Sequence, residues 1–94
     1  MKHVEMIGIR CQDGSRLYGE LTTWIIKPQY GTDPVIGFAL NIGGKDLKCS
    51  TVNTKHPEYQ GIDDARKRFV SMVLKDKLEK DFADYDVLYH KEVQ

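Results

Sequence analysis

The fold is decided by the stretch Val35-Ile36-Gly37-Phe38-Ala39-Leu40-Asn41-Ile42-Gly43-Gly44-Lys45-Asp46-Leu47-Lys48-Cys49-Ser50-Thr51-Val52. Two runs typical of β-strands flank Gly43-Gly44, and a glycine pair supplies the positive φ angles that a two-residue type I′ turn needs. The stretch therefore predicts a β-hairpin. Its two-residue loop pairs Leu40 with Leu47 and Phe38 with Cys49, so apolar side chains from both strands meet on one face.

Length and composition predict one globular domain, residues 1–94. A chain of 94 residues can bury a single hydrophobic core, and its 40% hydrophobic and 30% charged residues are ordinary values that exclude disordered, collagen-like and coiled-coil classes. Lys and Arg number 14, as do Asp and Glu, so the formal net charge is zero. Because duplex-DNA-binding proteins usually carry a basic excess, this balance argues against that class but leaves room for a local basic patch.

Short segments of the sequence bear on the cellular location and on the state of the two cysteines. No apolar run is long enough to span a bilayer, and the first five residues lack the apolar core of a signal peptide. We therefore expect a cytoplasmic protein with no membrane partner. Cys11 and Cys49 fall in strand-like runs and are expected to be buried, reduced thiols.

Two further strands are predicted before the central hairpin, at residues 4–11 and 15–26, joined at Gln12-Asp13-Gly14. A two-residue loop would pair Ile9 with Tyr18 and put the apolar residues of the two strands on opposite faces. A three-residue loop with Gly14 in a left-handed bulge pairs Ile9 with Leu17 and keeps them on one face. Since a one-residue slip inverts every side chain, we predict the three-residue loop.

One helix is predicted, from Gly61 to about Asp84. Its apolar residues form two rows, where a surface helix normally buries a single stripe. The first row is Ile62, Ala65, Phe69, Met72 and Val73, and the second is Val70, Leu74, Leu78 and Phe82. Either the helix kinks near Leu74–Asp76, or the second row packs against something outside the first four strands.

The tail, residues 85–94, leaves two alternatives open. Residues 85–90 alternate and contain residues that favour strands, so the tail could add a short fifth strand at the sheet edge. It could instead cover the second helix row, which another chain could also do. The fold class predicted is α+β: a four-stranded antiparallel meander over residues 4–52, followed by one long C-terminal helix on one face and a possible short fifth strand.

No sequence motif indicates catalysis, a cofactor or a metal. Gly43-Gly44-Lys45 lacks the spacing and the following Ser or Thr of a P-loop, and no serine lies in a nucleophile elbow. The spacing of the two cysteines and three histidines matches no zinc pattern. Asp63-Asp64 is explained by the helix start, where carboxylates favour the positive end of the dipole. We expect a non-catalytic protein without a metal or cofactor.

The two faces of the predicted sheet carry the remaining information about function. The helix is expected to cover Ile7, Ile9, Leu17, Leu21, Ile25, Phe38, Leu40 and Leu47. The opposite side then carries Val4, Met6, Arg10, Arg16, Tyr18, Thr22, Trp24, Ile26, Val35, Ala39 and Lys48.

Three explanations fit this second face. The loop at residues 28–33 or the C-terminal tail could cover part of it. It could be a dimer or partner interface, since Trp, Tyr, Met and Arg are enriched there. It could also bind single-stranded nucleic acid. The bases would stack on Tyr18 and Trp24, and the backbone would be held by Arg10, Arg16, Lys27 and Lys48.

Two resemblances bear on the nucleic-acid alternative. Antiparallel strands followed by one C-terminal helix are similar in order to the Pur and Whirly single-strand binders, which dimerise through such units. The stretch Asp64-Ala65-Arg66-Lys67-Arg68-Phe69 resembles the start of the last helix in double-stranded-RNA-binding domains, where basic residues meet phosphate. This chain lacks the first helix and the Gly-Pro-rich loop of that family, and has Asp63-Asp64 where lysines are expected. Neither resemblance assigns a site residue.

The sequence therefore predicts a small non-catalytic binding module that acts through protein–protein contacts, as a homodimeric accessory or regulatory protein. The alternative is a single-stranded nucleic-acid-binding module that uses the open sheet face. The residues expected to bind in either case are Arg10, Arg16, Tyr18, Trp24 and Lys48. No residue selects the partner or its pathway.

Overall fold

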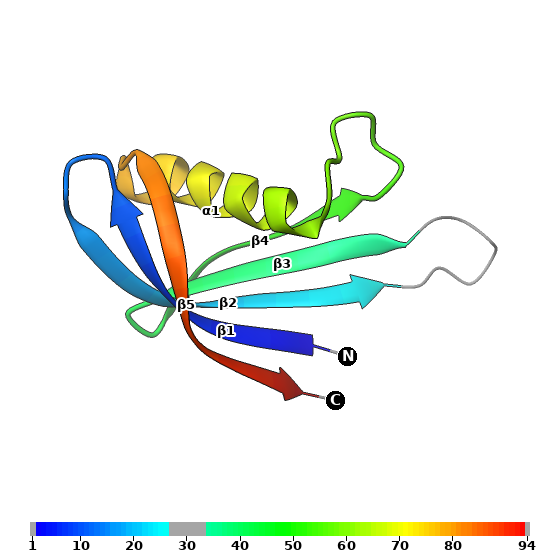
Figure 1. Cartoon of the computed structure of the whole chain (residues 1–94), viewed down its shortest axis with the longest axis horizontal. Coiled ribbons are helices and arrows are strands. Elements are labelled where there is room, and N and C mark those ends of the chain that lie inside the picture. The colour runs from blue at the N-terminus through cyan, green and yellow to red at the C-terminus, as the bar shows by residue number, and fades with distance from the viewer. Residues whose placement is uncertain (1, 27–33, 94) are drawn as a thin grey trace.

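The computed structural model describes residues 2–26 and 34–93, and both Lys27 and the predicted loop at residues 28–33 lie outside them. Five strands and one helix follow in chain order: β1 (Lys2–Cys11), β2 (Arg16–Ile26), β3 (Val35–Ile42), β4 (Lys45–Asn53), α1 (Ile62–Leu78) and β5 (Phe82–Val93). The strands form one antiparallel sheet in the order β4-β3-β2-β1-β5 (Figure 1). The α+β class and the meander are confirmed, and the fifth strand is present and 12 residues long.

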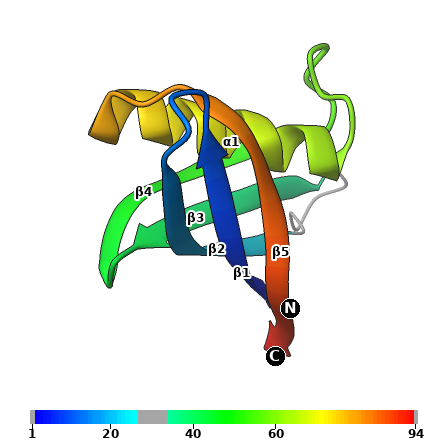
Figure 2. The ribbon, with the colours of Figure 1, turned by 60° about the vertical axis from the view of Figure 1, so that its left-hand side comes forward.

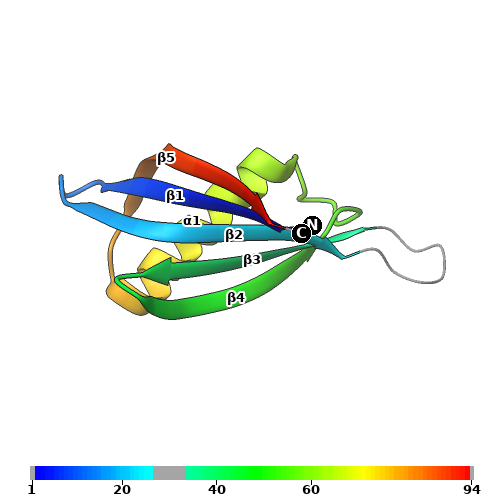
Figure 3. The ribbon, with the colours of Figure 1, turned by 90° about the horizontal axis from the view of Figure 1, so that it is seen from below.

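The last strand returns to pair with the first, so the two ends of the described chain lie side by side (Figure 2). Helix α1 crosses one face of the sheet, and none of the described residues forms a helix over the other face, which is turned toward the viewer in Figure 3. Over the described residues, no helix is long and apolar enough to cross a membrane.

The first hairpin has the predicted register. Ile9 pairs with Leu17, and the loop residue Gly14 has φ 86°. The Gly14 N–H donates to the Cys11 carbonyl at 3.0 Å, and the Cys11 N–H donates to the Ser15 carbonyl at 3.0 Å. The three-residue loop therefore places the apolar residues of both strands on one face, as the pattern required.

The central hairpin has the predicted turn but not the predicted pairing. Gly43 and Gly44 have φ angles of 63° and 81°, which suit a type I′ turn. Beyond the turn, a register shift at Leu40/Asn41 leaves Leu47 as an extra residue in β4.

Because of this bulge, Leu40 pairs with Lys48 and Phe38 with Ser50, so the predicted pairs Leu40–Leu47 and Phe38–Cys49 are wrong. One extra residue reverses the side of every later side chain in the strand. Lys48 consequently lies on the helix side of the sheet. Cys49 lies on the opposite side and is exposed, whereas Cys11 is buried, so the predicted burial holds for Cys11 only.

Helix α1 ends at Leu78 instead of Asp84. Glu79 has φ 54°, in the left-handed region, and its N–H donates to the Leu74 carbonyl. The following residues are held by the tip of the first hairpin, where the Gln12 N–H donates to the Asp81 carbonyl at 2.8 Å. These long-range contacts outweigh the local helical preference of residues 79–84, and Phe82 starts β5.

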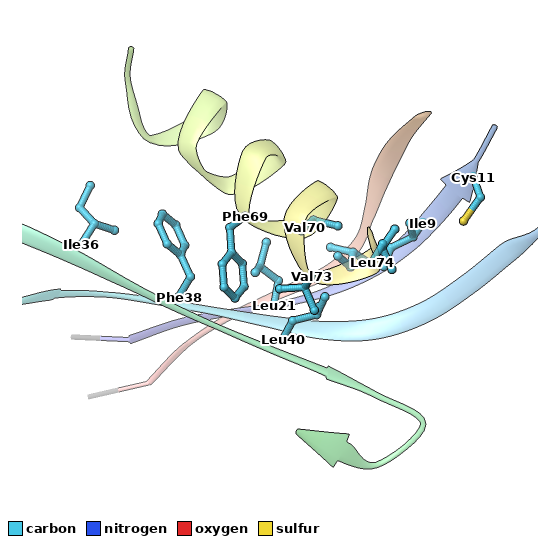
Figure 4. Close-up of a cluster of buried hydrophobic side chains, with 11 residues drawn as sticks. Ile9, Cys11, Leu21, Ile36, Phe38, Leu40, Phe69, Val70, Val73 and Leu74 are labelled. Carbon is cyan, nitrogen blue, oxygen red and sulfur yellow. The ribbon is translucent and has the colours of Figure 1, made fainter. Parts of the chain in front are cut away.

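The core lies between α1 and the sheet (Figure 4). Its buried members are Ile7, Ile9, Cys11, Leu21, Ile36, Phe38 and Leu40 from the sheet and Phe69, Val70, Val73 and Leu74 from the helix. Both helix rows contribute because β5 packs beside α1 and brings Phe82 and Tyr85 against this cluster. Ile25 was predicted under the helix, but it is 49% exposed, beyond the buried part of this face.

Candidate interaction surface

The sheet face opposite α1, seen in Figure 3, is called the open face below and carries several exposed large apolar side chains. Tyr18, Leu88 and Tyr89 are 58%, 60% and 62% exposed, and Met6 and Ile26 are also exposed. A soluble monomer rarely leaves a contiguous apolar patch of this kind in water. The open face is therefore the first candidate for a binding surface.

The apolar side chains of this face come from three strands that the register brings together. Met6 of β1 pairs with Tyr89 of β5, and a second register shift, at Met6/Ile7, leaves Leu88 as an extra residue. A Cβ built on Gly8 would lie 3.5 Å from Tyr18 Cε1 and 3.7 Å from Leu88 Cδ1. The side chains of Tyr18 and Leu88 thus flank Gly8 and form one continuous patch.

Trp24 lies at the far end of the open face, against the backbone of β3. A Cβ built on Gly37 would lie 2.2 Å from Trp24 Cε2 and 2.5 Å from Nε1, so the indole ring occupies the space that any other residue at position 37 would fill. The glycine therefore allows the ring to lie flat on the sheet. Trp24 is consequently half-buried instead of projecting from the surface.

The charges of the open face are balanced. By register, this face carries the basic residues Lys2, Arg10, Arg16 and Lys91 and the acidic residues Glu20, Asp46, Asp84 and Asp86. Arg10 is already engaged, because its Nη2 lies 3.4 Å from Asp84 Oδ2 and 3.7 Å from Asp86 Oδ1.

Asp84 is held in its charged form by several groups. The Tyr85 backbone N–H donates to Asp84 Oδ1 at 2.9 Å and lowers the pKa of that carboxyl, with Lys67 and Arg10 adding to the effect. Lys67 Nζ lies 3.4 Å from Asp84 Oδ1, so this carboxylate joins α1 to the edge of the sheet.

The structure brings together three of the five predicted binding residues. Arg10 pairs with Arg16, and Tyr18 follows two residues later on the same face. Trp24 shares the face but lies six residues from Tyr18 along β2, which is roughly 20 Å at the usual rise of a strand.

Lys48 does not belong to this surface. Its Nζ lies 3.3 Å from Asp76 Oδ2 of α1, on the other side of the sheet. The prediction that Lys48 lies on the open face is wrong. The alternation of apolar and polar residues in this strand gives no sign of the bulge at Leu47.

Sequence reasoning missed Leu88 and Tyr89, the two most exposed large apolar side chains of the face. The alternation of apolar and polar residues within residues 85–90 is the feature that could have identified them, because it predicts a strand. Without the register of β5 against β1, however, the side chains could not be assigned to a face.

The helix side of the sheet holds a buried ion pair. Glu5 Oε1 lies 3.6 Å from Arg66 Nε, with side chains 10% and 15% exposed. Tyr85 is close enough that burial, and then the charge of Glu5, raise the pKa of its phenol. In the described ranges, no group of three or more His, Cys, Asp or Glu side chains is arranged to hold a metal ion.

Comparison with known proteins gives no relative: no protein-family model, curated protein or solved structure matches this chain.

Proposed function

We propose that this domain is a non-catalytic binding module that acts through protein–protein contacts, and that its open face is the interface of a homodimer. The observation that carries the proposal is the apolar patch of Met6, Tyr18, Leu88 and Tyr89, exposed on the sheet face that lies opposite α1. Burying such side chains against a second copy removes them from water, which is the main driving force of association.

The size of the face supports this assignment. The five strands are 8 to 12 residues long, so at roughly 3.3 Å per residue and about 4.8 Å between strands the face covers about 800 Å². A standard protein interface removes ~800 Å² of surface from each partner. Two copies packed face to face therefore bury enough surface for a stable dimer, in the manner of two packed sheets.

The charges of the face also favour a second copy over nucleic acid. A face with equal numbers of basic and acidic residues does not repel its own copy, whereas a phosphate backbone would meet Glu20 between Tyr18 and Trp24. Arg10, moreover, is already paired with Asp84 and Asp86. A strand of nucleic acid would have to displace those carboxylates.

The experiment is a dilution series followed by ¹H–¹⁵N NMR, from millimolar to low micromolar protein. We expect concentration-dependent shifts at the amides of Met6, Tyr18, Leu88 and Tyr89, and none on the outer surface of α1. Oligo(dT) is then added at low salt to the most dilute sample, and Trp24 fluorescence is recorded. Quenching of Trp24 together with concentration-independent NMR shifts would replace the dimer by the nucleic-acid alternative.

A further inference from the structure

A second surface of the molecule, on the helix side, has the features of a peptide-binding site. A groove runs between α1 and β4, with a volume of about 370 Å³, which is within the range of small ligand sites. Phe38, Val52, Phe69 and Met72 supply apolar side chains to it, and Asp64 and Arg68 lie among its polar groups. Its floor lies on the helix side of the sheet, since Phe38, Ser50 and Val52 belong to that side by register.

One wall of this groove is an edge strand. Among the described residues, β4 pairs only with β3, so the backbone groups on its other side have no strand partner. Ser50 and Val52 share the helix side of β4 with Lys48 and line the groove, and Thr51 and Asn53 border it from the edge. The unpaired edge and the apolar hollow are therefore adjacent.

The two edges of the sheet differ in how they are protected against pairing with another strand. Natural edge strands are usually blunted by bulges and charged side chains. Strand β5 has two register shifts and several charged residues, and the first half of β4 has a bulge at Leu47 between Asp46 and Lys48.

The segment Cys49–Asn53 has none of these devices. It contains no charged residue, proline or glycine, and it pairs with β3 without interruption. It is thus a regular, unprotected edge that lies beside the groove.

We propose that Cys49–Asn53 and the groove bind an extended peptide segment of a partner protein, which adds a strand to β4. A strand added about 4.8 Å from β4 would send alternate side chains to the helix side, where the groove begins. The apolar floor, with the stacked rings of Phe38 and Phe69, selects aromatic or long aliphatic side chains at those positions. The occupant is therefore an extended segment with large apolar residues at every second position.

The probe is a short blocked peptide in which phenylalanine alternates with threonine, with a lysine at its end for solubility. It is added to the full chain and followed by ¹H–¹⁵N NMR. We expect saturable shifts at the amides of Cys49–Asn53 and of residues 65–72, and none at Met6 or Tyr18. The same peptide with serine in place of phenylalanine should not bind. Shifts on the open face instead, or equal binding of the serine peptide, would overturn the proposal.

Two N-methylated versions of the peptide test whether the backbone pairs with β4. One carries methyl groups on the phenylalanine nitrogens and the other on the threonine nitrogens. In an added strand only every second N–H faces the edge, so one version should lose binding and the other keep it. Binding that survives in both versions, or is lost in both, overturns strand addition.

Two methionines provide a matched pair of chain variants. Met72 lines the groove and is 38% exposed, and Met6 lies on the open face and is 36% exposed. Met72→Lys should weaken the phenylalanine peptide roughly tenfold or more, the usual effect of losing a central apolar contact. Met6→Lys should leave peptide affinity unchanged and weaken self-association. The homodimer proposal and the peptide-binding proposal can therefore fail independently of each other. NMR shifts at Cys49–Asn53 that change with protein concentration in the absence of peptide would show that a second copy of the chain pairs with this edge. That result would overturn the peptide-binding proposal.

Discussion

Glu5 and Arg66 form an ion pair that joins β1 to α1, with 3.6 Å between Glu5 Oε1 and Arg66 Nε. Glu5 Oε1 is buried and accepts no hydrogen bond from the described residues. Arg66 Nε donates to Thr23 Oγ1 at 3.3 Å, and Arg66 Nη1 lies 3.2 Å from Asp63 Oδ1. Arg66 is thus the cation next to a carboxylate that is largely removed from water.

We predict that Arg66→Ala strongly destabilises the fold. Removing one partner of a buried ion pair leaves the other charge uncompensated, which costs about 3–5 kcal/mol of the free energy of unfolding. Urea denaturation followed by the fluorescence of Trp24, the only tryptophan, measures this change.

The matched control for this prediction is Arg68→Ala, two residues along the same helix. Arg68 Nε lies 2.8 Å from Asp64 Oδ2, but these side chains are 54% and 37% exposed. An exposed pair contributes about 0–1 kcal/mol, so this variant should unfold near the wild-type midpoint. Equal losses for the two variants would show that burial does not set the strength of the Glu5–Arg66 pair.

A second prediction concerns pH and the first hairpin loop. The Ser15 hydroxyl and the Ser15 backbone N–H both donate to Asp13, and Lys80 Nζ lies 3.2 Å from its carboxylate. These groups lower the pKa of Asp13 from 3.8 to about 2. The Asp13 carboxyl should therefore titrate near pH 2 in an NMR experiment on the folded protein, and Ser15→Ala should raise that pKa.

The sign of the effect on stability follows from this shift. A carboxyl whose pKa is lowered by folding stabilises the fold above its unfolded-state pKa and loses this contribution as the pH falls toward its folded-state pKa. The wild-type protein should therefore exceed Asp13→Asn in stability above pH 3.8, with the difference vanishing toward pH 2. A difference that grows on acidification would have the wrong sign.

The third prediction compares two glycines in the sheet. Gly37→Ala forces a methyl group into the Trp24 ring, to within 2.2 Å of Cε2 if nothing moves. We expect a loss of about 1–3 kcal/mol, as for other overpacked sites, and a red shift of Trp24 emission as the ring is displaced toward water. Gly8→Ala is the control, because its methyl group would meet Tyr18 at an ordinary 3.5 Å. It should leave stability unchanged or raise it slightly; a loss equal to that of Gly37→Ala would contradict the assignment.

The two cysteines should differ in reactivity. Cys49 is exposed in the monomer and Cys11 is buried, so in native protein diluted until the monomer predominates one thiol should react quickly with an aromatic disulfide reagent and the second only on unfolding. Cys49→Ser should remove the fast reaction. If both thiols or neither reacted quickly, the result would contradict the register of β4 that exposes Cys49.

The sequence was informative wherever a local pattern had only one consistent arrangement. Ile9 and Leu17 could share a face only through a three-residue loop, and the structure has that loop. Gly43 and Gly44 likewise required a tight turn.

The features that could not be predicted depend on contacts between distant segments. The bulge at Leu47 moves Lys48 to the helix side, although nothing in the alternation of that strand marks an extra residue. Helix α1 ends at Leu78 because residues 80 and 81 are bound by the first hairpin, not because a glycine or proline follows. The surface on which Leu88 and Tyr89 lie likewise exists only once β5 has paired with β1.

The central claim, that the open face is the interface of a homodimer, is tested most directly by sedimentation velocity on the wild-type protein and two leucine variants. Leu88 lies on the open face and Leu78 at the end of α1, and both are exposed enough to accept lysine without loss of the fold. We predict that the wild type and Leu78→Lys sediment as dimers and Leu88→Lys as a monomer. A wild-type protein that stays monomeric at high micromolar concentration, or a Leu88→Lys variant that remains a dimer, would contradict the account.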